Sequence, residues 1–157
     1  YTQGIKVILT PMERSMPDAK SINYLHATIA LNKAKDQGAV EALYMDQSGL
    51  IKEGTTSNLF AFYGETLVTP EKKVLSGITR KVILEIAKDL YKIQLSEITI
   101  KDLLSADEVF ISGSSKGVVP VVRIDDEIIG SGKPGKHTMT LMTRLKQYVE
   151  QSASSNM

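Results

Sequence analysis

The sequence predicts a single α/β domain with a mixed, largely antiparallel sheet and flanking helices. Short apolar runs of strand length are joined by tight turns such as Gly64-Glu65, which favours antiparallel hairpins. Three longer stretches instead carry apolar residues at the spacing of a helix face. The 157 residues contain no internal repeat and no linker, and this length suits one domain with a sizeable core.

The first half of the chain is predicted to form a buried strand, a helix and two hairpins. A loop with two prolines follows the first strand, and the helix ends at Gly38, a residue that favours helix termini. The turn 47–49 joins one pair of strands, and Gly64-Glu65 joins the next. The predicted strands are 5–9, 40–46, 50–53, 59–62 and 66–68, and the predicted helix is 26–37.

The second half is predicted to contain two longer helices around further strands. Thr79 is expected to cap the first of these helices, and Thr99 with Asp102 resembles a cap for a short helix ending near Ser105. Residues 151–157 are expected to fray as a terminal tail. The helices are predicted at 80–91 and 138–150, and the strands at 93–97, 108–111, 118–124 and 127–129.

Composition indicates an ordinary soluble protein. The net charge is +1, from 19 basic and 18 acidic residues, which gives no reason to expect nucleic acid or a membrane as partner. No apolar run reaches the roughly 18 residues of a membrane span. The absence of cysteine excludes disulfides and agrees with a cytoplasmic location. The chain opens on Tyr1 in a strand-like run, and is therefore expected to be part of a longer protein.

Residues 53–80 concentrate small and hydroxyl-bearing side chains between short apolar runs. The hydroxyl and N–H groups of residues 55–57 and the helix start near Gly77 could seat a phosphate. Glu53 is not needed for that role, so this acid requires a separate explanation. An ordinary turn and a surface acid remain the alternatives on composition alone.

Two other signals do not support a site. Residues 130–138 resemble a phosphate-binding P-loop, but His137 stands where Ser or Thr would bind magnesium. His26 and His137 are the only histidines, and they lie far apart without acids at ligand spacing. No metal site is therefore expected.

The motifs of residues 53–80 resemble those of one enzyme family. The order Glu-x-Thr-x-x-Asn-Leu-Phe (53–60), Leu-x-Thr (67–69) and Leu-x-Gly-Ile-Thr-Arg (75–80) is similar to the signature of the class IV, or fold type IV, pyridoxal-phosphate aminotransferases. The resemblance implies the large domain of the D-amino-acid aminotransferase-like fold, a pseudo-barrel. Residues 1–150 would form this cofactor-binding domain, and the family's smaller N-terminal domain would be absent from the chain.

The resemblance also implies a catalytic lysine. Asp-Ala-Lys-Ser-Ile-Asn-Tyr-Leu (18–25) is similar to the family segment with the Schiff-base lysine, which makes Lys20 that residue. Its amine would bind the cofactor aldehyde and later move the substrate's α proton. Most lysines are solvated surface charges, and the sequence motif is what distinguishes Lys20.

The other expected site residues follow from the same resemblance. Glu53 would hold the pyridine nitrogen protonated. Ser114 stands where relatives usually carry threonine, and the backbone N–H of Ser115 would meet the substrate carboxylate. The expected phosphate-binding residues are Ile78, Thr79, Ser114 and Arg14; Tyr24 would contact the cofactor's phenolic oxygen, and Ser115 and Thr56 would bind substrate.

The function that the resemblance implies is transamination between an amino acid and a 2-oxo acid such as 2-oxoglutarate. Asn-Tyr-Leu after the lysine, together with Gly-Ile-Thr-Arg, favours a branched-chain amino acid, and the family resemblance implies a homodimer. Three alternatives stay open: a D-amino-acid aminotransferase, an aminodeoxychorismate lyase, and a catalytically inactive cofactor-domain fragment. A nonenzymatic interaction domain would require Lys20, Glu53 and Thr79 to occupy their positions by accident.

Overall fold

A computed structural model describes residues 2–12 and 25–154. The helices are α1 (Leu25–Asp36), α2 (Ile78–Ala87), α3 (Ile100–Ser105) and α4 (Lys136–Ser154). The strands are β1 (Ile5–Thr10), β2 (Glu41–Met45), β3 (Leu50–Gly54), β4 (Asn58–Tyr63), β5 (Thr66–Thr69), β6 (Lys92–Leu95), β7 (Ile98–Thr99), β8 (Glu108–Gly113), β9 (Gly117–Ile124) and β10 (Glu127–Ile128).

Six of the strands close into a barrel. Their order is β4-β8-β9-β1-β2-β3, and β3 pairs with β4 to complete the ring. The pairs β1–β2, β1–β9 and β5–β6 are parallel, and the other described pairs are antiparallel. The predicted α/β fold with a mixed, largely antiparallel pseudo-barrel is therefore confirmed.

The barrel interior is filled by aliphatic side chains. One buried cluster draws residues from all six barrel strands, including Val7, Leu43, Ile51, Leu59 and Val121. Because successive strand residues face opposite sides, the neighbours of these residues point outward. The outward side chains need a second layer to cover them.

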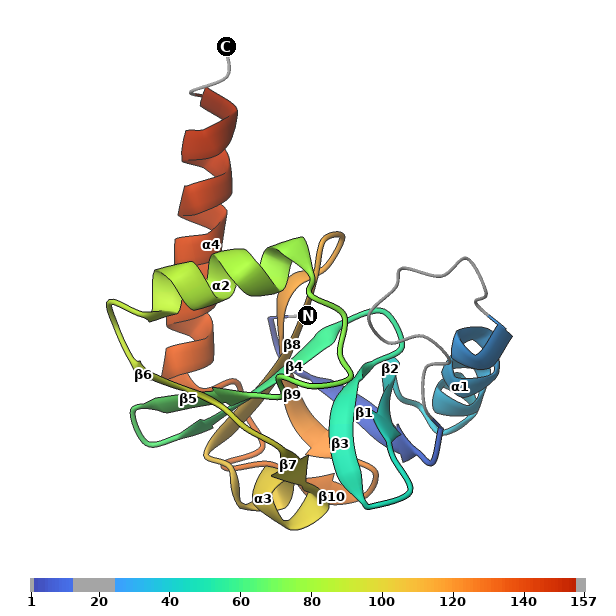
Figure 1. The fold of residues 1–157 in the computed structure, drawn as a ribbon. Helices are drawn as coiled ribbons and strands as arrows, with labels where there is room; N and C mark the ends of the chain where they lie inside the picture. Colours follow the sequence, from blue (N-terminus) through green and yellow to red (C-terminus); the bar gives the residue numbers. More distant parts are fainter. Residues whose placement is uncertain (1, 13–24, 155–157) are drawn as a thin grey trace.

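Helices α2 and α4 cover one outer face of the barrel (Figure 1). Phe60 stacks on Phe110 with ring centroids 4.7 Å apart, and both pack in a cluster with Ile83 of α2 and Leu141 of α4. Residues 60 and 62 are buried on this face, and 59 and 61 are buried inside the barrel. Strand β4 is therefore apolar on both faces.

Helix α1 covers a different part of the barrel. Its Ala30 and Ala34 pack on Ile8 of β1 and Ala42 of β2, in a small cluster of mostly short side chains. The second half of α4, in contrast, extends away from the barrel (Figure 1). None of the described helices combines the length and apolar composition of a membrane span.

The ends of α2 and α4 differ from the sequence prediction. Gly77, with extended backbone (φ −63°, ψ 143°), is the N-cap of α2, and no side chain in the described part of the chain caps this end. Thr79 is already the second helical residue, so the prediction that it caps the helix is wrong. Helix α4 continues through residues 151–154, where Ser152 and Ser154 donate hydrogen bonds to carbonyls four residues earlier.

Candidate functional site

Glu53 is a buried carboxylate at the point where β3 and β4 close the barrel. Its side chain is 2% exposed, and the β3–β4 pairing places it opposite Asn58. The Oε2 atom accepts hydrogen bonds from the backbone N–H of Leu75 at 3.0 Å and from Asn58 Nδ2 at 3.4 Å. Asn58 Nδ2 also donates to the Leu75 carbonyl at 2.8 Å. This contact set fixes both the position and the orientation of the carboxylate.

Asn58 also links Glu53 to the start of α2. A Cβ atom on Gly77 would lie 2.5 Å from Asn58 Oδ1, so only glycine permits this approach without a shift. The next residue, Ile78, is 77% exposed, and the first turn of α2 contains no acidic residue. An uncapped helix start carries partial positive charge and favours an anion.

The first turn of α2 also contains a buried arginine, Arg80. Arg80 is 8% exposed, and its Nη2 donates to the carbonyl of Pro70 at 2.9 Å. Burial lowers the pKa of Arg80, and the charges of Glu71 and Glu53 act in the opposite direction. Arg80 therefore adds positive charge to the surroundings of Glu53 and holds the segment that leads into α2.

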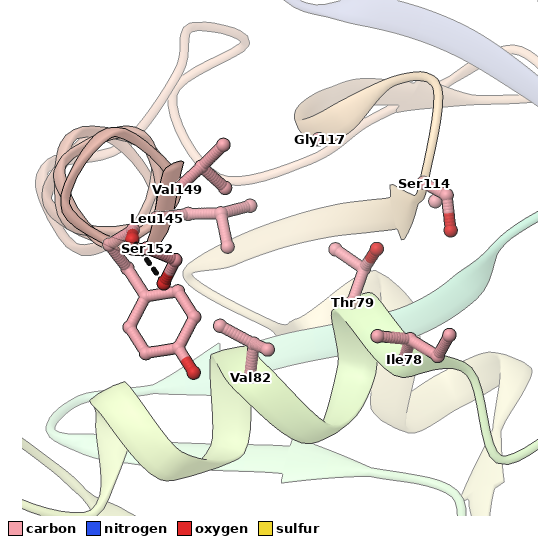
Figure 2. Close-up of a pocket in the computed structure, with 10 residues that line it drawn as sticks. Ile78, Thr79, Val82, Ser114, Gly117, Leu145, Val149 and Ser152 are labelled. Carbon is pink, nitrogen blue, oxygen red and sulfur yellow. Dashed lines mark hydrogen bonds between the residues drawn. The ribbon is translucent and has the colours of Figure 1, made fainter. Parts of the chain in front are cut away.

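The β8–β9 turn faces the start of α2. Its Ser114 and Ser115 are exposed, and the hydroxyl-bearing side chains of Thr79 and Ser114 point toward one another (Figure 2). Thr79 and Ser114 both line a pocket of about 290 Å³ whose other walls come mainly from α2 and α4, including Val82, Leu145 and Val149. The predicted residues Ile78, Thr79 and Ser114 are thus brought together.

The loop between β3 and β4 approaches this turn. A Cβ atom on Gly113 would lie 3.1 Å from the carbonyl oxygen of Thr56, so the two backbones are in close contact. Next along β8, the Ser112 hydroxyl is buried without a hydrogen-bond partner among the described residues. Thr56 and Ser115 therefore lie on adjacent segments at the same end of the barrel.

Glu41 organises these two segments, and it was not predicted from the sequence. This β2 residue is fully buried and accepts hydrogen bonds from Thr55 Oγ1, from Thr56 Oγ1 at 2.9 Å and from Ser57 Oγ at 3.2 Å. Lys116 Nζ lies 2.8 Å from Glu41 Oε2 and 2.9 Å from Thr56 Oγ1. An acid inside the apolar run of residues 39–45 is the signal that could have revealed it.

These contacts decide the ionisation of Glu41. Burial alone would raise the pKa of its carboxyl group, but the hydrogen bonds from Lys116 and Thr55, and the charge of Lys116, hold that pKa below its ordinary value. Glu41 is therefore an ionised group that ties together three separate parts of the chain.

Three predicted site residues cannot be placed. Lys20, Arg14 and Tyr24 lie outside the described residues. The other predicted residues, Glu53, Thr56, Ile78, Thr79, Ser114 and Ser115, occupy the end of β3 and its loop, the start of α2 and the β8–β9 turn. Among the residues that the structure describes, no group of His, Asp or Glu side chains could hold a metal ion.

Comparisons with known proteins identify the family. The family model for amino-transferase class IV matches residues 3–124. A putative branched-chain-amino-acid aminotransferase of Methanocaldococcus jannaschii is 34% identical over 145 residues, covering 90% of this chain and 50% of the relative. A D-alanine aminotransferase of Bacillus licheniformis is 35% identical over 135 residues, which are 84% of this chain and 47% of that protein.

A solved structure agrees with the sequence relatives. The branched-chain amino acid aminotransferase from Escherichia coli has a TM-score of 0.82 and 31% sequence identity. The match covers 90% of this chain and 51% of that one. The chain spans about half the length of the curated relatives it matches. In fold, motifs and sequence, the chain belongs to the class IV aminotransferases.

Proposed function

We propose that this chain is the pyridoxal-phosphate-binding domain, residues 1–150, of an aminotransferase that moves an amino group between an amino acid and a 2-oxo acid. The observation that carries the proposal is the buried carboxylate of Glu53, which backbone and amide donors hold beside the uncapped start of α2. A fixed carboxylate and an anion-binding helix start, linked through one asparagine, suit a ligand with both a basic ring nitrogen and a phosphate.

The residues at this end of the barrel fit that cofactor. The first-turn N–H groups of Ile78 and Thr79, with the hydroxyls of Thr79 and Ser114, would bind the phosphate. Arg14 would add a further positive charge there, and Tyr24 would donate to the phenolic oxygen. When bound, pyridoxal phosphate supplies an electron-accepting ring that stabilises the charge left by removal of the substrate's α proton.

Each side chain would have a defined task in the reaction. Glu53 keeps a proton at the ring nitrogen, because an ionised carboxylate stabilises the cationic ring. The Lys20 amine would hold the cofactor through its aldehyde, and it would take and return the proton at the substrate's α carbon. The backbone N–H groups of Ser115 and Thr56 would bind the substrate carboxylate and orient the α C–H bond, because the single hydroxyl proton of Thr56 is donated to Glu41.

The proposed donor is a branched-chain amino acid, with a 2-oxo acid such as 2-oxoglutarate as the acceptor. Similarity to branched-chain aminotransferases in both sequence and structure supports this choice. Similarity to D-alanine aminotransferases keeps D-amino acids as the second candidate. We further propose a cytoplasmic homodimer, in which the neighbouring subunit and the additional half found in relatives complete the substrate site.

The proposal is tested by covalent labelling. The protein is incubated with pyridoxal phosphate, reduced with borohydride, digested and analysed by mass spectrometry. We expect a yellow protein and one pyridoxyl phosphate group on Lys20. Lys20→Ala should lose both, and Lys101→Ala, which changes an exposed lysine of α3, should keep both. Equal labelling of wild-type protein and Lys20→Ala would overturn the proposed cofactor site.

Substrate assays then separate the remaining possibilities. Turnover of L-leucine with 2-oxoglutarate supports the proposed donor, whereas turnover restricted to D-alanine replaces it with the second candidate. Release of pyruvate from aminodeoxychorismate would contradict transamination and indicate a lyase. Specific labelling of Lys20 without any turnover would support the cofactor site and contradict independent activity of this chain.

A further inference from the structure

The β3–β4 loop and the β8–β9 turn are joined through one buried carboxylate. Glu41, on β2, accepts hydrogen bonds from hydroxyls of the loop, and Lys116 reaches it from the turn. The same ammonium also donates to Thr56 Oγ1 at 2.9 Å. Lys116 therefore contacts both the loop and the residue that anchors the loop. We name Glu41, Thr56 and Lys116 the loop clasp.

The loop clasp lies where its geometry affects the proposed substrate site. Thr56, one of its members, and Ser115, the immediate neighbour of Lys116, are the two residues proposed to bind the substrate carboxylate. Gly113 packs against the Thr56 carbonyl, so a small shift of the turn would change the spacing of these two groups. A bound carboxylate requires both donors at hydrogen-bond distance at once.

The charge balance argues against Lys116 as a direct anion ligand. Its positive charge is matched by the buried carboxylate of Glu41, 2.8 Å away, and its side chain is only 19% exposed. An ammonium in this arrangement has little net charge to offer a substrate. Its contacts instead restrain the position of the turn relative to the loop.

We propose that Lys116 is a positioning residue that acts through Glu41 and Thr56 to set the spacing of the substrate-carboxylate site. The inference rests on the proposed function, because it assigns Thr56 and Ser115 to that carboxylate. Loss of the clasp weakens substrate binding in the ground state and the transition state alike. Such a loss raises KM and leaves kcat nearly unchanged.

The test compares Lys116→Met, Lys116→Arg and Lys101→Met. Binding of 4-methylpentanoate, a branched carboxylate without an amino group, is measured by its effect on the absorbance of the cofactor-loaded protein. We expect Lys116→Met to raise the Kd of this ligand and the KM of L-leucine about tenfold, with kcat within about threefold. Lys116→Arg should stay near wild type because it keeps the charge and donors, and Lys101→Met should behave as wild type.

A double-mutant cycle separates positioning from general structural damage. Glu41→Gln with Lys116→Met removes both charges, so the double variant does not bury an unpaired carboxylate. We expect its 4-methylpentanoate Kd to be no higher than that of either single variant, because all three lack the same clasp. Additive losses, or a wild-type Kd in Lys116→Met, would overturn the inference.

The cofactor titration distinguishes this inference from the proposed function. Wild-type protein that takes up no pyridoxal phosphate on Lys20 contradicts the proposed function itself. If the wild-type protein is labelled on Lys20 and Lys116→Met binds 4-methylpentanoate with an unchanged Kd, only the inference about the loop clasp is contradicted. Equal loss of cofactor affinity and carboxylate affinity in Lys116→Met also contradicts it, because the effect would then extend beyond the substrate site.

Discussion

Glu53 illustrates what one residue can do once its surroundings are fixed. Carboxylates are rarely buried without partners, because removal from water disfavours the charged form. Here the N–H of Leu75 and the amide of Asn58 donate to one oxygen and hold the group in a single orientation. The proposed task, to keep a proton on a ring nitrogen, depends on both the charge and that orientation.

Substitution of Glu53 by Gln keeps the shape and removes the charge. We expect turnover to fall about 100-fold or more, because a neutral amide no longer favours the protonated ring. The cofactor's absorbance should also become that of the unprotonated ring. Steady-state kinetics and a visible spectrum measure both effects. Glu127→Gln, which changes an exposed strand residue, is the matched control, and wild-type turnover of Glu53→Gln would refute the assigned role.

Among the secondary-structure elements, helix α4 depends at its start on a residue from strand β8. Glu108 of β8 accepts the backbone N–H groups of His137 at 3.0 Å and Thr138 at 2.7 Å. A Cβ atom on Gly135 would lie 1.9 Å from the Glu108 side chain, so the approach requires glycine. The negative charge of Glu108 also interacts favourably with the partial positive charge at the start of the helix.

Removal of this cap should destabilise the protein. We expect Glu108→Ala to lower the free energy of unfolding by about 1–2 kcal/mol, since two helix N–H groups lose their acceptor. Urea unfolding followed by circular dichroism measures the change. Glu85→Ala, which breaks a surface pair with Lys88, should have little effect. If Glu108→Ala and Glu85→Ala lowered the free energy of unfolding equally, the cap at the start of α4 would have no specific stabilising effect.

The short helix α3 shows how well a local pattern can be read. Thr99 Oγ1 accepts the Asp102 N–H at 3.2 Å, and Asp102 Oδ2 accepts the Thr99 N–H at 2.9 Å, as the predicted capping pattern requires. The cap of α2 was mispredicted because Gly77 supplies extended backbone without a side-chain capping hydrogen bond, and the hydroxyl of Thr79 was taken for the cap.

Buried ionised carboxylates contribute to the stability of the whole molecule. Asp46 is 7% exposed, accepts the N–H groups of Ser48 and Leu50, and lies 3.1 Å from Lys52 Nζ. Burial alone would raise the pKa of Asp46, but these partners hold that pKa below its ordinary value of 3.8. A lowered pKa means that the stabilisation is present above 3.8 and is lost as the pH falls through the folded value.

Acid should therefore reduce the stability of the protein. We expect the free energy of unfolding to decline as the pH falls below about 4, since buried carboxylates such as Asp46 take up protons on unfolding. Asp46→Asn should be less stable than wild type at pH 7, and the difference should narrow toward about pH 3. Urea titrations across this range measure both curves. A difference that stays constant with pH would contradict the role given to Asp46.

The local features of this protein follow from the order of its residues alone. The turns at 47–49 and Gly64-Glu65, the periodicity of the helices, and the motifs of residues 53–80 depend on neighbouring residues, so they could be read directly. Those motifs also identified the family, which the comparisons confirm.

Contacts between distant segments, in contrast, depend on the complete folded structure. Glu41 and Lys116 are 75 positions apart, and their contact follows from the order of β2, β8 and β9 around a closed barrel. The pairing of Glu53 with Asn58 both closes that barrel and places the carboxylate beside α2. Such contacts depend on the register of many strands at once, and no local pattern of residues encodes that register.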